Sequence, residues 1–319
     1  MDQNYFIDVQ LIVSIIATIF YSFILYLILT SRSEAMRSAF FRFYIVTGFC
    51  DILGLFALEW TRAELKSSLG PDFELATRLM ATMTGINFFT HILGCFLMTL
   101  NRFTGVCFPH QQNIIWCKRN VYLCLFIEIV ISILIHIEAL TTSIAYVQTA
   151  DGGWRIAGRN GSVDATRVIG SILTLLYEGV SIVLISYTIY MINKQLRISG
   201  HRFTQDIGLL SVTIISCIMS IFECVYDVSF LFNFENSVIL WIKAQYNINF
   251  FLVMTTNAWS IFFLSHSLRN ELSRHWRKTC RIKSNHNTTR SSPFPVSATR
   301  TLHTQMYSRS RTDQCFPLG

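Results

Sequence analysis

The amino-acid sequence predicts an all-α membrane protein built as a seven-transmembrane helix bundle. Hydrophobic residues make up 52% of the 319 residues and charged residues only 14%, whereas a soluble domain carries about 25% charged residues. Seven long apolar runs follow one another, and Lys and Arg lie almost entirely between them or after the last. A chain with so few charged groups cannot cover its surface with them, so part of that surface must face lipid.

Each apolar run is long enough to cross a hydrocarbon core about 30 Å thick, which takes about 20 helical residues. The first run carries no charged residue and is longer than the apolar region of a signal peptide, so we retain it as a permanent span. The predicted spans are Val9–Leu29, Phe40–Trp60, Arg78–Leu100, Val121–Val147, Val168–Ile192, Ile207–Phe232 and Val238–Leu264.

The basic residues favour a multi-pass orientation with the N-terminus outside. The inner connections and the tail then hold nineteen of the 26 Lys and Arg residues, and the outer connections hold seven, as the positive-inside rule requires. Asp2 and Asp8 precede the first span, and Arg32 and Arg37 follow it. In this orientation the sequon that begins at Asn160 lies in an outer loop, where it can be glycosylated.

The character of the chain changes after the seventh span. Leu268, Leu272 and Trp276 recur every four residues among arginines, a pattern typical of a basic amphipathic helix on an anionic membrane leaflet. Cys280 follows as a candidate for palmitoylation. Ser, Thr and Arg then dominate with little apolar content, which predicts disorder. The predicted segments are the receptor bundle 1–264, the amphipathic juxtamembrane helix 265–282 and the disordered cytoplasmic tail 283–319.

The third span ends in Asn101-Arg102-Phe103, and Pro109 and Trp116 follow it. This spacing resembles the Asp-Arg-Tyr signature of rhodopsin-like G-protein-coupled receptors. The Asn-Arg-Phe form with the following proline and tryptophan resembles the nematode serpentine chemoreceptors, in particular their class-gamma group. The resemblance implies that Asn101, Arg102, Phe103 and Pro109 couple the receptor to a heterotrimeric G protein. The alternative is that Arg102 only anchors the end of the span.

The resemblance also implies a small-molecule ligand, such as an odorant, a pheromone or a metabolite, and a place in the plasma membrane of sensory neurons. The sequence departs from the rhodopsin-like pattern in the seventh span, where Asn257-Ala258 stands in place of Asn-Pro. No catalytic constellation, metal-ligand spacing or nucleic-acid motif occurs in the sequence. We therefore expect no enzyme, no metal or other cofactor and no nucleic-acid partner.

A carboxylate lies near the middle of the second span, at Asp51. Burying it in a bilayer costs at least about 2.5–3.5 kcal/mol, so it should face the bundle and have partners there. Asn87 and His91 are four residues apart and share a face of the third span. We expect a polar switch of Asp51, Asn87, His91 and Asn257, in which the histidine could act by protonation. The alternative is a hydrogen-bonded contact between helices without switching.

Polar residues in the outward halves of the spans are candidates for the ligand pocket, because the mouth of a bundle can enclose a small molecule. Mutual pairing of Asp227 with Lys243 is the structural alternative to ligand binding. The candidate pocket residues are Glu178, Glu223, Asp227, Lys243 and Tyr246.

Two other membrane functions fit parts of the sequence. A ligand-gated channel resembling insect odorant receptors would also have seven spans, but its N-terminus would lie inside. An ion-coupled transporter could use the intramembrane acids, although we find neither the repeated halves nor the broken helices typical of transporters. These acids are Asp51, Glu128, Glu138, Glu178, Glu223 and Asp227.

Overall fold

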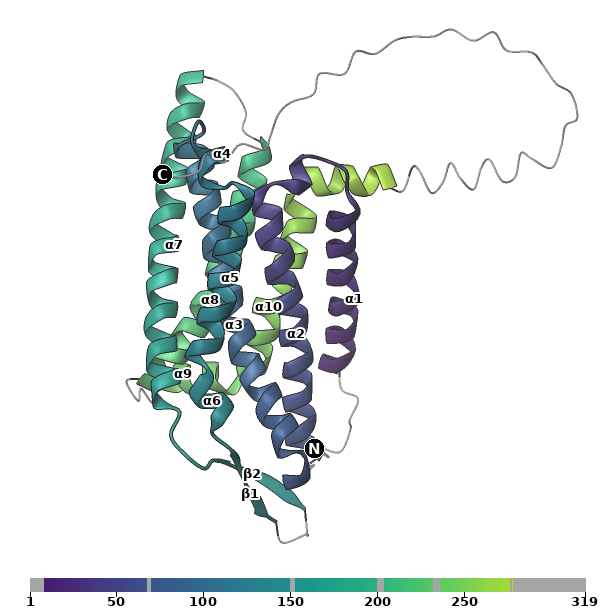
Figure 1. The fold of residues 1–319 in the computed structure, drawn as a ribbon, viewed down its shortest axis with the longest axis vertical. Coiled ribbons are helices and arrows are strands. Elements are labelled where there is room, and N and C mark those ends of the chain that lie inside the picture. Colours follow the sequence, from purple (N-terminus) through teal and green to yellow (C-terminus); the bar gives the residue numbers. More distant parts are fainter. Residues whose placement is uncertain are drawn as a thin grey trace, which may run out of the picture. The chain divides into compact units, whose positions relative to one another are not determined.

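The fold was determined as a computed structural model that describes residues 9–67, 70–149, 153–199, 204–231, 236–275 and 277. The chain divides after Arg269 into two compact units, Met1–Arg269 and Asn270–Gly319. The first unit holds a bundle of long helices (Figure 1).

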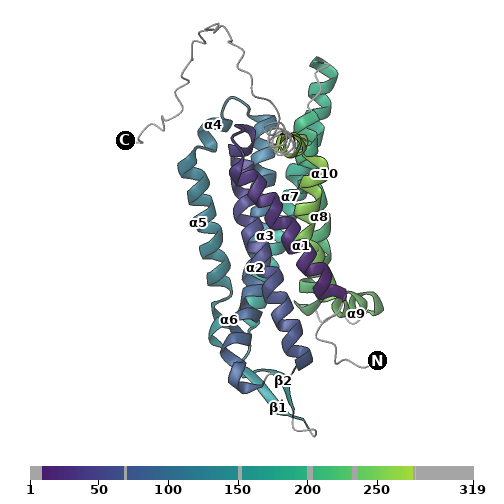
Figure 2. The ribbon, with the colours of Figure 1, turned by 90° about the vertical axis from the view of Figure 1, so that its right-hand side faces the viewer.

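In the bundle, the long helices run side by side, with a β-hairpin at one end and the short helix α4 at the other (Figures 1 and 2). We call these the hairpin end and the α4 end. The helices are α1 Val9–Thr30, α2 Ala39–Ser67, α3 Glu74–Cys107, α4 Gln112–Ile115, α5 Lys118–Ile135, α6 Ile137–Thr141, α7 Asp164–Ser199, α8 Thr204–Leu231, α9 Ser237–Ala244 and α10 Tyr246–Leu264. The hairpin consists of β1 Ile144–Gln148 and β2 Trp154–Arg159, and single 3₁₀ turns lie at Ala35–Arg37 and Pro71–Phe73.

Among the described helices, α1, α2, α3, α7, α8 and α10 are long and apolar enough to cross a membrane. The remaining predicted span corresponds to α5, whose 18 residues include Lys118, Arg119 and Glu128. At His136 the helix is interrupted, and α6 continues toward the hairpin. Together α5 and α6 run along the bundle beside α3 (Figure 2). The predicted bundle of helices is therefore confirmed, and its fourth predicted span consists of two helices.

Two of the predicted spans differ from the observed elements. The predicted span Val121–Val147 ends in a strand, because β1 begins at Ile144. The predicted span Val238–Leu264 is divided at Gln245, whose backbone N–H donates to both Trp241 O and Ile242 O at 3.1 Å. A continuous apolar run does not distinguish a helix from a strand or mark a break within a helix, so the run predicts the crossing and not its internal division.

The bundle buries polar side chains together with an apolar core, and its outside is largely apolar. Asp51 and Asn257 are 0% exposed, whereas Ile19, Phe126 and Val183 are each 66% exposed. Leaving an aliphatic or aromatic side chain in water costs about 1.5–3 kcal/mol relative to burying it. A belt of such side chains therefore requires a lipid surround, and inside the bundle the buried polar contacts add to the apolar packing that holds the helices together.

The centre of the bundle is α3, which contacts α2, α5, α7, α8 and α10. Its 34 residues extend about 51 Å at 1.5 Å per residue, which exceeds the hydrocarbon thickness. It approaches α2 closely at Gly94, where an added Cβ would overlap Thr47 Oγ1 and lie 3.0 Å from Thr47 Cβ. A glycine is required here because any side chain would push the two helices apart.

The hairpin was not expected from the sequence. Its strands pair antiparallel from Ile144↔Arg159 to Gln148↔Trp154, with an irregularity between Ala145 and Tyr146. Gly158, opposite Ala145, has φ 142°, a conformation that L side chains rarely adopt. The pairing passes over Ala157, so this residue forms a β-bulge.

The predicted amphipathic helix is described only in part. Residues 266–275 are helical, and Leu268 is buried. In the second unit, Arg274 Nη1 lies 3.5 Å from Glu271 Oε2, one helical turn away. Trp276, Cys280 and the predicted tail 283–319 lie outside the described residues.

Candidate functional site

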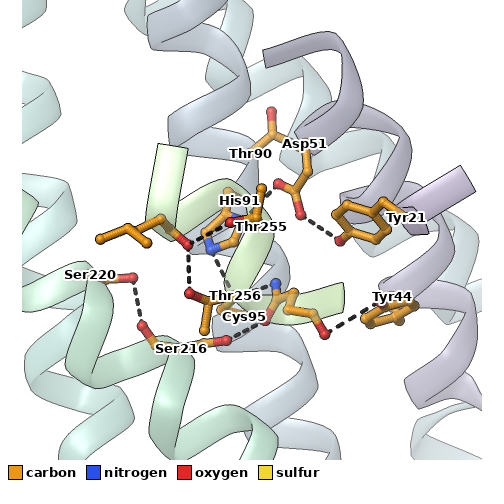
Figure 3. Close-up of polar contacts among 12 residues, drawn as sticks. Tyr21, Tyr44, Asp51, Thr90, His91, Cys95, Ser216, Ser220, Thr255 and Thr256 are labelled. Atoms are coloured by element: carbon orange, nitrogen blue, oxygen red, sulfur yellow. Dashed lines mark hydrogen bonds and ion pairs between the residues drawn. The ribbon is translucent and has the colours of Figure 1, made fainter. Parts of the chain in front are cut away.

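A buried carboxylate in α2 joins three helices near the middle of the bundle. Asp51 Oδ1 lies 2.7 Å from His91 Nδ1 in α3, and Tyr21 in α1 donates its hydroxyl hydrogen to Asp51 Oδ2 at 2.6 Å. All three side chains are at most 1% exposed. Figure 3 shows Tyr21 and His91 directed at this carboxylate from the two neighbouring helices. Both oxygens of the carboxylate are thereby satisfied.

From His91 the polar chain continues toward α10 and α8. His91 Nε2 lies 3.5 Å from Cys95 Sγ, and Asn257 Nδ2 donates to the same sulfur at 3.5 Å. Ser216 in α8 donates to Asn257 Oδ1, and Tyr44 in α2 donates to Asn257 O at 3.4 Å. We call the set Tyr21, Asp51, His91, Cys95, Asn257 and Ser216 the polar core.

The donors and acceptors in the polar core have a consistent direction. An ionised Asp51 carries no hydrogen, so His91 Nδ1 must donate to it. In a neutral imidazole, Nε2 is then the acceptor for the Cys95 thiol. A protonated imidazole would instead donate at both nitrogens, and Cys95 Sγ would then accept from His91. A single proton therefore reverses the direction of one link in the chain.

The sequence placed Asp51, His91 and Asn257 together, but missed three members of the polar core. Cys95 lies four residues after His91 and so shares its helical face, a signal that was available. Tyr21 and Ser216 carry no such signal, because single polar residues in apolar spans are common. Asn87, which we expected in the switch, is 2% exposed. Its Nδ2 has no hydrogen-bond partner among the described residues.

A second buried acid lies in α5. Glu128 is 2% exposed, and neither of its carboxyl oxygens has a hydrogen-bond partner among the described residues. It interacts electrostatically with Asp51 and His91. The polar core is therefore bordered on the α5 side by an acid that makes no hydrogen bond within this part of the chain.

The Asn-Arg-Phe motif lies in the last turns of α3, toward the α4 end. The Arg102 guanidinium carbon is 4.5 Å from the centre of the Phe40 ring in α2, a cation–π contact. Asn101 is 3% exposed. Trp116, beyond α4, donates its indole hydrogen to Thr104 Oγ1 at 2.6 Å. The tryptophan of the motif thus holds the α4 segment against the end of α3.

The other members of the motif are more open. Phe103 contacts Phe108 and Tyr187 in α7, with ring centres 5.9 Å away in both cases. Pro109 is exposed in the turn after α3. The arrangement gathers Arg102, Phe103 and Pro109 at one end of α3, opposite the hairpin (Figure 1).

The candidate pocket residues do not form one cluster among the described side chains. Glu178 in α7 is 6% exposed and accepts a hydrogen bond from the Cys217 thiol at 3.0 Å. It lines a groove in the apolar wall between α7 and α8, with a volume of about 530 Å³. Tyr246 stacks on Tyr226 with ring centres 4.7 Å apart. The side chains of Glu223, Asp227 and Lys243 lie outside the described residues.

Two more predicted residues lie at the hairpin end. Glu138, one of the six acids, accepts a hydrogen bond from Thr166 N at 2.8 Å, which satisfies an unpaired N–H in the first turn of α7. Asn160 is exposed just after β2, and its Nδ2 donates to Ser143 Oγ at 2.8 Å. The sequon is accordingly accessible.

The fold and its polar interior define a multi-pass helical membrane protein of the seven-transmembrane class. The family model for the serpentine type 7TM GPCR chemoreceptor Srv matches residues 10–278. The chain therefore belongs to this family, and the resemblance to nematode serpentine chemoreceptors is confirmed. A search of curated proteins found no match. The family makes the chain a chemosensory G-protein-coupled receptor in general terms.

Proposed function

We propose that this receptor binds a small external molecule, such as an odorant, pheromone or metabolite, and activates a heterotrimeric G protein. The N-terminus and the hairpin end face outside, and the α4 end faces the cytosol of a sensory neuron. The receptor acts as a switch in the plasma membrane and catalyses no reaction itself. The single observation that carries the proposal is the polar core, which links α1, α2, α3, α8 and α10 in the middle of the bundle.

A polar chain of this kind can couple the two ends because hydrogen-bonded partners have discrete arrangements. A ligand that moves α8 or α10 changes the distances from Asn257 to Ser216 and Cys95. His91 then shifts against Asp51, and both residues lie on helices that reach the α4 end. A ligand drives this change only by the difference in its affinity for the two arrangements.

At the α4 end, Arg102 provides the charge that meets the G protein. In the structure its guanidinium rests on Phe40. In this proposal, activation moves the guanidinium away from Phe40 and toward the G protein. Phe103 and the exposed Pro109 lie beside it and complete the proposed coupling surface. Asn101 is uncharged, so it cannot form the ion pair with Arg102 that an acidic residue at this position would form.

The ligand pocket of this proposal lies in the half of the bundle toward the hairpin. Glu178 supplies a buried carboxyl beside an apolar groove, and Tyr246 belongs to an aromatic cluster with Phe250 and Phe88. Glu223, Asp227 and Lys243 complete the candidate set from sequence alone.

The test is nucleotide exchange on purified heterotrimeric G proteins by the receptor in nanodiscs. Arg102→Ala should abolish the exchange that the wild-type receptor stimulates, and the melting temperature is measured for both proteins so that a loss of folding is distinguished from a loss of coupling. Arg42→Ala also removes an arginine near the α4 end, but from α2. It is the matched control and should retain exchange. Equal exchange by the Arg102→Ala variant and wild type would contradict the proposed coupling surface.

A further inference from the structure

A cavity lies beneath the hairpin, separate from the polar core and from the Glu178 groove. Its volume is about 370 Å³, within the range of about 300–1,000 Å³ typical of ligand pockets. Figures 1 and 2 show the hairpin beside the ends of α2 and α3, and these two helices contribute Thr61, Thr77 and Ala81 to the lining. The lining residues are Thr61, Thr77, Ala81, Ile144, Ile156, Gly158, Arg159, Gly161, Ser162, Val163, Asp164 and Arg167.

The cavity has a cationic wall. Arg159 Nη1 donates to the backbone carbonyls of Ala139 and Thr142, which are neutral acceptors at the end of α6. A guanidinium has five N–H donors, so Nη2 and Nε can bind a further acceptor. Burial and, after it, the positive charges of Arg167 and Arg78 lower the pKa of Arg159, and Glu74 opposes them. An anion beside Arg159 would favour the charged guanidinium and so offset both effects on its pKa.

The acids near the cavity are mostly engaged elsewhere. Glu74 Oε1 accepts from Ile144 N at 2.9 Å and lies 3.5 Å from Arg78 Nε. Glu138 accepts from the first turn of α7. Asp164 lines the cavity but is exposed at the start of α7. Arg159, which is half-buried, therefore faces the cavity without a carboxylate hydrogen-bonded to it among the described residues.

An unsatisfied hydroxyl lies in the same cavity. Thr77 is 1% exposed, lines the cavity, and its Oγ1 has no hydrogen-bond partner among the described residues. Buried hydroxyls are normally paired, and an unpaired one costs free energy. A ligand oxygen acceptor would satisfy it. The rest of the lining is largely aliphatic, with Ile144, Ile156 and Val163.

We propose that the cavity beneath the hairpin binds a small amphiphilic carboxylate. The carboxylate accepts hydrogen bonds from Arg159 and Thr77, and its aliphatic body packs against Ile144, Ile156 and Val163. A guanidinium matches a carboxylate in shape, so the pairing favours this anion over an alcohol of equal length. This inference deepens the proposed receptor function by naming a ligand class, but it is tested by binding alone.

The test uses purified receptor in phosphatidylcholine nanodiscs without any G protein. Octanoate, octanol and octylamine are compared by isothermal titration and by the shift in melting temperature. We expect octanoate to bind and to raise the melting temperature. Octanol and octylamine should bind at least about tenfold more weakly, because they lack the charge-assisted contact. Equal binding of octanol, or preference for octylamine, would overturn the proposal.

Variants locate the binding in this cavity. Arg159→Gln should weaken octanoate binding about tenfold or more. Thr77→Val should weaken it about threefold, and it keeps the shape of a side chain whose hydroxyl has no described partner. Ala81→Leu should block it by filling the cavity. Arg155→Gln, an exposed change in the same strand, is the matched control. Unchanged binding by Thr77→Val and Ala81→Leu would place octanoate elsewhere and overturn the proposal.

The same anionic chemistry could come from a lipid headgroup, and an additional arm separates the two sources. The titration is repeated in nanodiscs that contain phosphatidylglycerol. Unchanged octanoate binding supports a soluble ligand, whereas loss of binding identifies the lipid as the occupant and overturns the assignment to a small carboxylate. If octanoate binds but no G protein is ever activated, the proposed function fails while this inference stands.

Discussion

The pair of Asp51 and His91 gives the sharpest test of the polar core. Each side chain is buried, and each satisfies the other at 2.7 Å. Asp51→Leu leaves the His91 Nδ1 hydrogen and the Tyr21 hydroxyl without their acceptor, and His91→Leu leaves the carboxylate with Tyr21 alone. Breaking a buried pair by removing one partner costs about 3–5 kcal/mol. Each single variant should therefore lose about that much stability.

The double variant should lose much less than the sum, because it leaves no uncompensated charge. The coupling energy should reach about 2–3 kcal/mol, measured by SDS-induced unfolding in mixed micelles. The control cycle pairs His91→Leu with Thr30→Ala, whose hydroxyl donates to Tyr26 O at an end of α1. That cycle should be additive. Additivity within about 0.5 kcal/mol for Asp51 and His91 as well would refute the coupling.

Three further outcomes are expected. Gly94→Ala should destabilise the receptor by about 1–3 kcal/mol through overpacking against α2. Gly179→Ala, with nothing within 4 Å of the added methyl group, should instead be neutral or stabilise by up to about 1 kcal/mol; equal melting temperatures would contradict this contrast. Trp116→Phe should cost about 1 kcal/mol in chemical unfolding, because it removes the hydrogen bond to Thr104. Asn160→Gln should abolish the glycosidase-sensitive change in gel mobility, and retained sugar on that variant would place the glycan elsewhere.

The sequence predicts the spans well because lipid imposes one requirement on length and polarity. It fails at Gln245 and His136, where helices break without proline or glycine. These breaks depend on local backbone hydrogen bonds, such as the bifurcated one at Gln245 N, which leave no mark in an apolar run. The hairpin was missed for a related reason: Ile144 to Val147 continue the apolar run of the preceding helix.

The sequence predicts the candidate site where two signals agree: the free-energy cost of a carboxylate in the membrane, and the helical spacing that places polar residues on one face. Asp51 had to find partners, and His91 faced it from the next span. Asn87 was assigned by the same spacing, yet its side chain packs near Gly54, where a Cβ would lie 3.2 Å from Asn87 Cβ. The cavity lined by Arg159 could not be predicted from the sequence. Thr77 is distant from Arg159 in the sequence, and the two line one cavity only because the hairpin folds over the ends of the helices.

The sulfur of Cys95 is a weak link between two more tightly bonded parts of the polar core. On one side, Asp51 is held by contacts of 2.6 and 2.7 Å, and on the other, Asn257 is fixed by Ser216. Between them, both contacts to sulfur are 3.5 Å long, and a thiol is a weak donor and a weak acceptor. The polar core therefore consists of two tightly hydrogen-bonded groups that are connected only by weak contacts to a sulfur atom. When α10 moves relative to α3, the two long contacts to the sulfur change first, and the shorter contacts of Asp51 and Asn257 follow.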